Sequence, residues 1–324
     1  MGSGIKVSVI LPSLNVAMYI EECMESVLRQ SLQDIEIICV DAGSDDGTLE
    51  VLKKYAAADK RVKVILSDKK SYGYQLNLGI DAACGEYIGI VDTDDYVPEE
   101  MYGELYHKAK ENKADFVKAD FYRFTGNGCK RKKTLCRLTE DMSYYNRVIN
   151  IEKEPECFLF PMNTWSGIYN KKFLSDHGIV HNESEGASFQ DNGFWFQTFM
   201  YAKRAFFLNK PYYRNRRDNP ASSVYSKDKV YCVCEEYRFI EDILNKERRY
   251  FETYKYVFTY IYFQVCKWNL YRIASAYRKD FLERFAEDFE RFYKRSMLKQ
   301  SMFCAEDWQL LGAVLQRSVD ILGD

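Results

Sequence analysis

The segment Ile88-Gly89-Ile90-Val91-Asp92-Thr93-Asp94-Asp95 joins an apolar run directly to three carboxylates. Its first four residues are typical of a buried β-strand. Carboxylates packed together at the end of such a strand repel one another unless they face water or a cation. Hard divalent cations prefer oxygen ligands and are often held by one or two carboxylates plus substrate phosphates. The segment therefore predicts either a metal site at a strand end or a turn that caps the next helix.

The sequence around this segment alternates between apolar runs and amphipathic segments. Strands are predicted at residues 7–11, 35–40, 62–66, 87–91 and 116–121, and Pro12 is expected to close the first. Helices are predicted between them at residues 19–30, 49–55, 75–83 and 98–112. Near-continuous apolar strands that alternate with helices indicate a mostly parallel sheet covered on both faces. We therefore expect an α/β fold with a mostly parallel central sheet and flanking helices.

Polar residues cluster just past the carboxyl ends of the predicted strands, at residues 12–15, 41–46, 67–68 and 92–95. Ligands of such sheets bind outside these strand ends, so we expect the clusters to converge on one edge. Asp41 is placed to accept hydrogen bonds from a base or a ribose, although a capping loop rich in turn residues explains the same segment. The chain lacks both GxGxxG and GxxxxGK[ST], which excludes the dinucleotide fingerprint and the P-loop.

Composition narrows the class of protein. The 324 residues include 46 Lys and Arg and 48 Asp and Glu, a formal net charge of -2, which argues against a nucleic-acid-binding protein or one built for an anionic membrane. The ten Cys show no CxxC spacing and are expected to be reduced thiols. No apolar run approaches the ~18 residues that span a bilayer. We expect a cytoplasmic protein, with peripheral contact to the inner face of the membrane left open.

The second half of the chain is less regular. Residues 126–133 form a basic segment that is expected to be a solvated hairpin tip, with a phosphate or acceptor contact as the alternative. From Tyr225 the pattern is helical, without Pro or Gly until Gly312. The stretch 260–271 is apolar or aromatic nearly all round, which favours packing over a membrane-surface helix. This helical region is expected to bind an acceptor, to form a homodimer or to contact a membrane.

Six short segments in the first 125 residues or so form one ordered pattern. They are residues 9–15, 26–31, 36–48, 77–80, 85–88 and 92–95. In this order and spacing the chain resembles the family 2 glycosyltransferases of the GT-A fold, of the bacterial polysaccharide type. The resemblance implies a catalytic domain at 1–224, with a nucleotide-binding half at 1–125 and an acceptor-binding half at 126–224. A C-terminal helical appendage would follow at 225–324.

The resemblance also implies roles for residues of the first half. Pro12, Asn15 and Asp41 would line the nucleoside pocket, with Asp41 meeting the base. Asp92 would lie near the ribose or donor sugar. Thr93 would belong to the same donor-binding segment.

The ion that the resemblance implies is Mn²⁺ or Mg²⁺. Asp94 would ligate it together with the diphosphate, and Asp92 would be the second candidate ligand. Many relatives carry an Ala-Arg-Asn-x-Gly segment, but here Leu76 replaces its Arg, which weakens any phosphate or base contact there. Asn77 is retained and is expected to hold the loop.

In the second half the match is looser. Asp191 corresponds to the family's general base, and Gln190 stands where Glu is common. A carboxylate within reach of an acceptor hydroxyl would assist its attack, whereas an Asp in a first helical turn also favours the helix dipole. Arg216 would close over the diphosphate or lie in a surface basic loop.

Each of two aromatic residues in the second half has two alternative roles. Trp165 either stacks on acceptor sugar or lies in the core. His181 is a candidate metal ligand, although a loop residue is the more common role of a lone His.

Taken together, the resemblance implies an inverting transfer of a sugar from a nucleotide-sugar, with a UDP-sugar as the default, to a saccharide or lipid-linked saccharide. Two other classes use similar residues. A sugar nucleotidyltransferase also has paired carboxylates and a metal, but typically a Gly-rich phosphate loop that is absent here. A non-catalytic carbohydrate-binding or scaffold protein would retain the fold with a decayed site.

Overall fold

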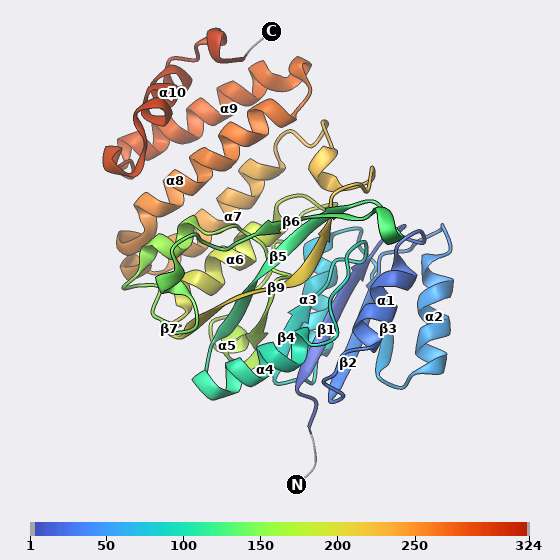
Figure 1. Ribbon diagram of the computed structural model, residues 1–324. Coiled ribbons are helices and arrows are strands. Elements are labelled where there is room, and N and C mark those ends of the chain that lie inside the picture. Colours follow the sequence, from blue (N-terminus) through green and yellow to red (C-terminus); the bar gives the residue numbers. More distant parts are fainter. Residues whose placement is uncertain (1–3, 323–324) are drawn as a thin grey trace. The chain divides into compact units, whose positions relative to one another are not determined.

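The computed structural model describes residues 4–322 (Figure 1). The chain divides into two compact units, the first ending at Asn219 and the second beginning at Pro220. The division falls five residues before the 224/225 boundary expected from the sequence. Strands occur in the first unit, and the four helices α7 to α10 form the second.

The first unit is built on a sheet of nine strands among the described residues, in the order β3-β2-β1-β4-β8-β5-β9-β7, with β6 paired to β5. The strands are β1 (Val7–Ser13), β2 (Ile35–Asp41), β3 (Val62–Leu66), β4 (Tyr87–Ile90), β5 (Phe116–Thr125), β6 (Lys132–Cys136), β7 (Val148–Ile149), β8 (Gly167–Asn170) and β9 (Ala205–Arg216). The helices are α1 (Ile20–Leu28), α2 (Thr48–Ala58), α3 (Tyr72–Ala82), α4 (Met101–Asn112), α5 (Lys171–Asp176) and α6 (Gln190–Tyr201).

The expectation of a mostly parallel sheet holds for the first half of the unit. Strands β3, β2, β1 and β4 are parallel, as are β5 and β9. Strand β8 lies between β4 and β5 and is antiparallel to both, and β6 and β7 are also antiparallel to their partners. The sheet is therefore mixed: β6 returns directly from β5 through a short connection, and β8 inserts between β4 and β5 in the opposite direction.

Pro12 does not close the first strand, contrary to expectation, because β1 continues to Ser13. The partner strand β4 ends at Ile90, opposite Ile10. The Val91 amide donates to the Ile10 carbonyl, so the backbone groups of Ile10 and, two residues on, Pro12 face the β4 side. The missing N–H of Pro12 therefore falls where β4 has already ended and no ladder bond is lost.

The register of the strands shows which helices share a face of the sheet. Ile10 contacts the Gly79 position of α3, whereas Gly89, which is paired with Val9, contacts Tyr102 of α4. Residues paired in register point to the same face, and Val9 and Ile10 point to opposite ones. Helices α3 and α4 therefore cover opposite faces of the sheet (Figure 1).

Helix α6 lies on the same face as α3. Tyr169 of β8 is paired with both Ile88 and Phe116, so these side chains point away from α4. Phe116 stacks on Phe199 of α6 at 5.2 Å between ring centroids, and Tyr169 meets Phe194 edge to face at 5.0 Å. Ile88, Ile90 and Asp92 are spaced two residues apart, so the Asp92 side chain is expected on this same α3–α6 face.

The basic segment expected at a hairpin tip is confirmed as the connection between β5 and β6. Its residues Asn127, Gly128, Lys130, Lys132 and Lys133 are exposed.

The second unit consists of α7 (Cys232–Lys246), α8 (Arg248–Arg272), α9 (Ser275–Lys294) and α10 (Ala305–Leu315), which confirms the predicted C-terminal helices. Phenylalanines at 258, 285, 289 and 292 form its core. Most of the 260–271 stretch is buried as expected, whereas Tyr260, Gln264 and Lys267 are half-buried and Trp268 and Tyr271 are nearly half exposed. None of the helices within residues 4–322 has both the length and the apolar composition that crossing a bilayer requires.

Candidate active site

The acidic segment that follows β4 forms a tight turn bonded to strands β9 and β1. The Asp95 amide donates to the Asp92 carbonyl at 2.9 Å and closes the turn. The Asp92 amide donates to the Tyr213 hydroxyl of β9 at 3.0 Å, and the Thr93 hydroxyl donates to the Pro12 carbonyl of β1 at 2.9 Å. These bonds fix the position of the Asp92 and Asp94 side chains relative to the sheet.

The side chains of Asp92 and Asp94 are half-buried and each has one hydrogen-bond donor. The Tyr72 hydroxyl, at the start of α3, donates to Asp92 Oδ1 at 2.8 Å. Asn219 Nδ2 donates to Asp94 Oδ2 at 2.8 Å. No sequence motif pointed to Tyr72, which lies near Asp92 because α3 packs against β1 and β2.

Asp95, the third carboxylate, has a structural role. It is 1% exposed, accepts the Arg216 amide at 2.6 Å and accepts Asn215 Nδ2 at 3.1 Å. Burial and the neighbouring charges of Asp94 and Asp92 raise the pKa of Asp95 well above its usual range. Asp95 thus fastens the acidic turn to β9 rather than facing a ligand.

The electrostatics of the turn favour a cation. Burial, the charge of Asp94 and that of Asp191 together raise the pKa of Asp92 to about 7, although the Tyr72 hydrogen bond opposes the shift. Such crowding of negative charge is relieved when a positive ion binds. The oxygen-only donor set fits Mn²⁺ or Mg²⁺. Within residues 4–322, no group of three or more His, Cys, Asp or Glu side chains is placed to hold a metal ion. Asp92 and Asp94 would therefore need substrate oxygens to complete the coordination.

The loop after β2 satisfies its carboxylate internally. Asp41 is fully buried; its Oδ1 accepts the Gly43 and Ser44 amides, both at 2.9 Å. Its Oδ2 accepts the Ser44 hydroxyl at 2.6 Å and the Ser13 hydroxyl at 3.4 Å. The capping interpretation describes these contacts, and a base could reach the carboxylate only by displacing one of the two hydroxyls.

Asn15 joins the loops that follow β1 and β2. Its backbone adopts a positive φ of 53°, its amide donates to the Ser44 hydroxyl at 2.9 Å and its Oδ1 accepts the Asp45 amide at 3.0 Å. Pro12, Asn15 and Asp41 therefore lie at one edge of the sheet, as expected for the ends of adjacent parallel strands.

Helix α3 links this edge to the rest of the site. Gln75 is buried, and its Nε2 donates to the Ser13 carbonyl at 2.9 Å and the Val40 carbonyl at 2.7 Å. Leu76, which replaces the family's Arg, is fully buried. It packs in the core, so this position offers no charge to a phosphate.

Asp191 lies in the first turn of α6 and is half-buried. Burial raises its pKa to about 6, although the backbone N–H groups at the helix start and the charge of Lys118 oppose the shift. The same electrostatics link Asp191 to Asp92 and to the buried Tyr72 and Tyr169. The structure thus brings the predicted general base to the carboxylate turn from 99 residues away in the sequence.

The loop before Asp191 is held by Gln190 and by α3. Gln190 Nε2 donates to the Ser184 hydroxyl at 3.0 Å and the Gly186 carbonyl at 3.1 Å. The Tyr72 amide donates to the Gly186 carbonyl at 2.9 Å. A Gln in place of the common Glu therefore anchors the loop through its amide group.

Asn77 and Gly73 of α3 hold the same loop further back. Asn77 exchanges two hydrogen bonds with the His181 backbone, of 3.0 Å and 2.9 Å, as the loop-holding interpretation predicts. A Cβ at Gly73 would lie 1.9 Å from the Asn182 carbonyl oxygen, so only Gly allows this approach.

Of the two roles considered for His181, a metal ligand or a loop residue, its surroundings favour the loop residue. Its ring is buried and stacks on Phe194 at 4.1 Å, and burial lowers its pKa to about 3. The imidazole is therefore a neutral part of the packing between the loop and α6, and no carboxylate cluster within the described part of the chain includes it.

Arg216 is buried, so the surface-loop alternative is wrong. Its Nε donates to the Asp94 carbonyl at 2.8 Å, and its terminal nitrogens pair with Glu22 at 2.8 Å and Asp218 at 3.3 Å. The guanidinium also lies 4.6 Å from the ring centroids of both Tyr19 and Phe124. Arg216 thus joins the acidic turn to α1, and it would reach a diphosphate only after leaving these partners.

Trp165 lies in the core, which was one of its two expected roles. It is 9% exposed, stacks on Tyr213 at 4.2 Å and meets Phe121 edge to face at 4.8 Å. Because the Tyr213 hydroxyl accepts the Asp92 amide, this stack supports the acidic turn from behind.

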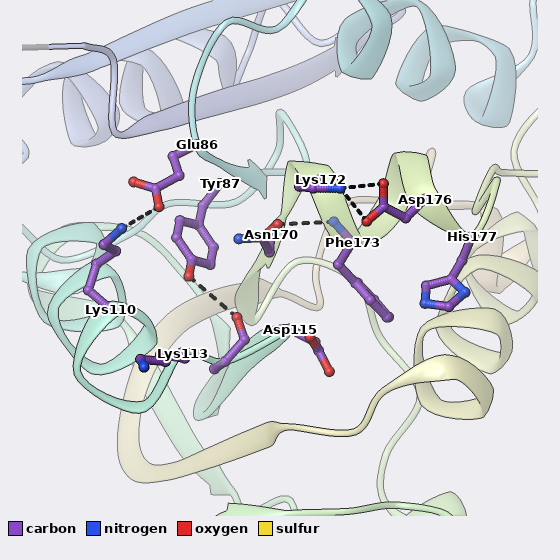
Figure 2. A pocket seen from close by; sticks show the side chains of 11 residues that line it. Glu86, Tyr87, Lys110, Lys113, Asp115, Asn170, Lys172, Phe173, Asp176 and His177 are labelled. Atoms are coloured by element: carbon purple, nitrogen blue, oxygen red, sulfur yellow. Dashed lines mark hydrogen bonds and ion pairs between the residues drawn. The ribbon is translucent and has the colours of Figure 1, made fainter.

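A separate cavity of about 360 Å³ lies at the opposite edge of the sheet, where β4 and β5 begin (Figure 2). Its charged groups largely satisfy one another: Lys110 pairs with Glu86 at 2.5 Å and Lys172 with Asp176 at 2.6 Å. Parallel sheets bind ligands at the carboxyl ends of the strands, so this cavity is not the candidate active site.

Comparison with known proteins bears on the family and the fold of this chain. A family model described as glycosyl transferase family 2 matches residues 8–168. The uncharacterized glycosyltransferase EpsJ of Bacillus subtilis is 32% identical over 225 residues, which cover 67% of this chain and 62% of EpsJ. The chain thus spans less than two thirds of this relative.

Two crystal structures of TarS from S. aureus have a similar fold. One TarS structure superposes with a TM-score of 0.72 at 21% identity, covering 98% of this chain and 54% of that one. TarS 1-349 in complex with UDP gives a TM-score of 0.71 at 20% identity, covering 98% of this chain and 89% of that one. The likeness confirms the GT-A-like architecture, with its mixed sheet and helices on both faces.

Proposed function

The chain belongs to glycosyl transferase family 2, and from this we propose that it transfers a sugar from a nucleotide-sugar to a saccharide or lipid-linked saccharide acceptor. The observation that carries the proposal is the meeting of Asp92, Asp94 and Asp191 at the carboxyl edge of the sheet. UDP is the proposed carrier, since UDP is bound in the TarS complex whose fold the chain shares.

Asp94 and Asp92 would hold Mn²⁺ or Mg²⁺ together with the diphosphate. A divalent ion at this position would offset the charge that develops on the departing nucleotide. The unshared carboxylate oxygens support this assignment, because one oxygen of each side chain carries the Tyr72 or Asn219 hydrogen bond and leaves the other for a ligand.

Asp191 would act as the general base. An acceptor hydroxyl is a weak nucleophile, and a carboxylate within hydrogen-bond reach removes its proton as the new bond forms. A pKa of about 6 leaves Asp191 ionised at neutral pH yet basic enough to take the proton. The acceptor oxygen then attacks the anomeric carbon in a single displacement, which inverts its configuration.

The test is a donor-hydrolysis screen with UDP-, GDP- and CDP-sugars and Mn²⁺, read as nucleotide release. Release from one donor, abolished by EDTA and by Asp94→Ala, is expected. Asp176→Ala serves as the matched control, because Asp176 lies by the cavity at the opposite edge of the sheet (Figure 2) and should leave release unchanged. Silence across the panel, without any thermal shift by nucleotide plus Mn²⁺, would contradict the proposal and favour a binding protein.

A further inference from the structure

Lys118 is a buried cation that the mechanism above does not use. It lies in the middle of β5 and is 1% exposed. Its strand neighbours Val117 and Ala119 are also fully buried. Moving an ammonium group from water into a protein interior costs several kcal/mol, whereas Met or Leu would fill the same space without that cost. A lysine here therefore calls for an explanation beyond packing.

The contacts of Lys118 Nζ are polar but neutral. It donates to the Asn163 carbonyl at 2.6 Å, to Asn163 Oδ1 at 2.9 Å and to the Tyr169 hydroxyl at 3.4 Å. Within residues 4–322, Nζ has no carboxylate at ion-pair distance. These bonds satisfy its protons and fix its position, but they leave its charge without an adjacent counter-charge.

The carboxylate on which this charge acts is Asp191, at the start of α6. Lys118 is two residues from Phe116 on β5, so both side chains point to the α3–α6 face of the sheet. Phe116 stacks on Phe199 of α6, and Tyr169, which touches Lys118 Nζ, packs edge to face on Phe194. Phe194 is one helical turn from Asp191. Lys118 thus lies beneath the first turn of α6.

The other groups that act on Asp191 from the packed elements are Asp92 after β4, Tyr72 of α3 and Tyr169 of β8. Asp92 carries the same charge as Asp191, and the two tyrosines are neutral because burial raises their pKa values above their usual range. The backbone N–H groups of Asp191 and Asn192 lower the pKa of Asp191, and the charge of Lys118 lowers it further. In return Asp191 raises the pKa of Lys118, which burial lowers to about 7.

We propose that Lys118 is a positioning residue of the transfer reaction, whose buried ammonium keeps Asp191 in its carboxylate form beside Asp92 and fixes the segment from Asn163 to Ser166. This inference rests on the proposed function, because it assigns Lys118 a part in the work of the general base. The second effect follows from Asn163, which holds the Ser166 hydroxyl at 2.6 Å as well as Lys118. Trp165, between these residues, supports Tyr213 and through it the acidic turn.

The test compares the pH dependence of kcat/KM in the wild type, Lys118→Met and Lys118→Gln. The Met variant removes the charge and the hydrogen bonds, whereas the Gln variant removes the charge but retains a donor for Asn163. Loss of an opposite charge raises the pKa of a carboxylate, so the acidic limb should move to higher pH in both variants, by about one unit. At pH 5.5 this corresponds to roughly a tenfold loss beyond any loss at pH 8.

The outcomes separate this inference from its premise. An inactive wild type would overturn the proposed function before any variant is compared. An active wild type whose acidic limb stays in place in Lys118→Gln, with activity restored relative to Lys118→Met, would leave Lys118 a purely structural role and overturn the inference. Should Lys118→Met fail to fold, as judged by its thermal transition, Lys118→Gln carries the comparison alone.

Discussion

Two acidic loops follow β2 and β4, the two strands that flank β1 in the parallel part of the sheet, and the carboxylates of the two loops have opposite surroundings. After β2, Asp41 accepts two backbone amides and two hydroxyls, and Asp46 accepts the Ala17 and Thr48 amides and the Thr48 hydroxyl. These bonds lower the pKa of Asp46 despite some desolvation. After β4, Asp92 and Asp94 have one donor each and lie beside Asp95 and Asp191.

The difference shows why a strand-end Asp cannot be assigned from its position alone. A carboxylate that accepts several N–H and O–H groups is stabilised as an anion and needs no ion. A carboxylate that lies among like charges binds a cation or a proton more tightly, because either one relieves the repulsion. The carboxylates after β2 are satisfied by donors from their own loop and from Ser13 and Ala17, whereas the turn after β4 leaves carboxylate oxygens open to a ligand.

The largest expected effect is on catalysis. Asp191→Asn should lower kcat by about 10²–10⁴-fold, because the acceptor hydroxyl would lose its base. Asp46→Asn, the same isosteric change in the closed loop, should leave kcat within about threefold. Steady-state kinetics with the donor identified by the screen measures both. Equal losses in the two variants would break the distinction between an open and a closed acidic segment.

The next effect is on metal-dependent nucleotide binding. UDP with Mn²⁺ at about 100 times its Kd should stabilise the wild type by about 2.7 kcal/mol, a shift that Asp94→Ala or EDTA should abolish. Asp46→Asn should keep the shift. Thermal unfolding with and without UDP and Mn²⁺ reports it, and a shift that survives in Asp94→Ala would remove Asp94 from the metal site.

A smaller effect is expected from pH. Because the pKa of Asp191 is about 6, kcat/KM should fall about tenfold for each pH unit below that value, as the base becomes protonated. The sign follows from the raised pKa: an unperturbed Asp would stay ionised to about pH 4. A pH–rate profile from 4.5 to 8 at saturating Mn²⁺ checks the limb, and a flat profile down to pH 4.5 would contradict the assignment.

The smallest effect concerns stability, where the two segments should respond with opposite signs. The folded-state pKa of Asp92 is about 7, above its usual value, so its ionised form opposes folding at pH 8 and Asp92→Asn should raise Tm slightly. Asp41→Asn should lower stability by about 1–3 kcal/mol, because an amide nitrogen would replace an oxygen that accepts buried donors. Calorimetry at pH 8 compares the pair, and a fall in Tm for both would refute the contrast.

Most of the first half of the fold was predictable because its signals are local. Strands at Val62–Leu66 and Tyr87–Ile90 were predicted almost to the residue, since apolar runs and flanking turn residues are read directly from adjacent positions. The start of α3 at Tyr72 was missed by three residues, although Ser71 accepts the Tyr74 amide as a typical N-cap. The mixed order of the second half was missed because the insertion of β8 between β4 and β5 depends on long-range pairing.

The sequence by itself determined that acidic segments would lie at one edge of the sheet, because they follow the carboxyl ends of predicted parallel strands. Only the tertiary structure decided which carboxylates stay open. Asp41 accepts from Gly43 and Ser44 of its own loop and from Ser13 of β1, whereas Asp92 meets Tyr72 from α3 and Asp191 from α6. The burial of Arg216 and of Lys118 was likewise decided by packing. Burial and distance between groups far apart in the chain set the charge that each one carries, and no local pattern encodes them.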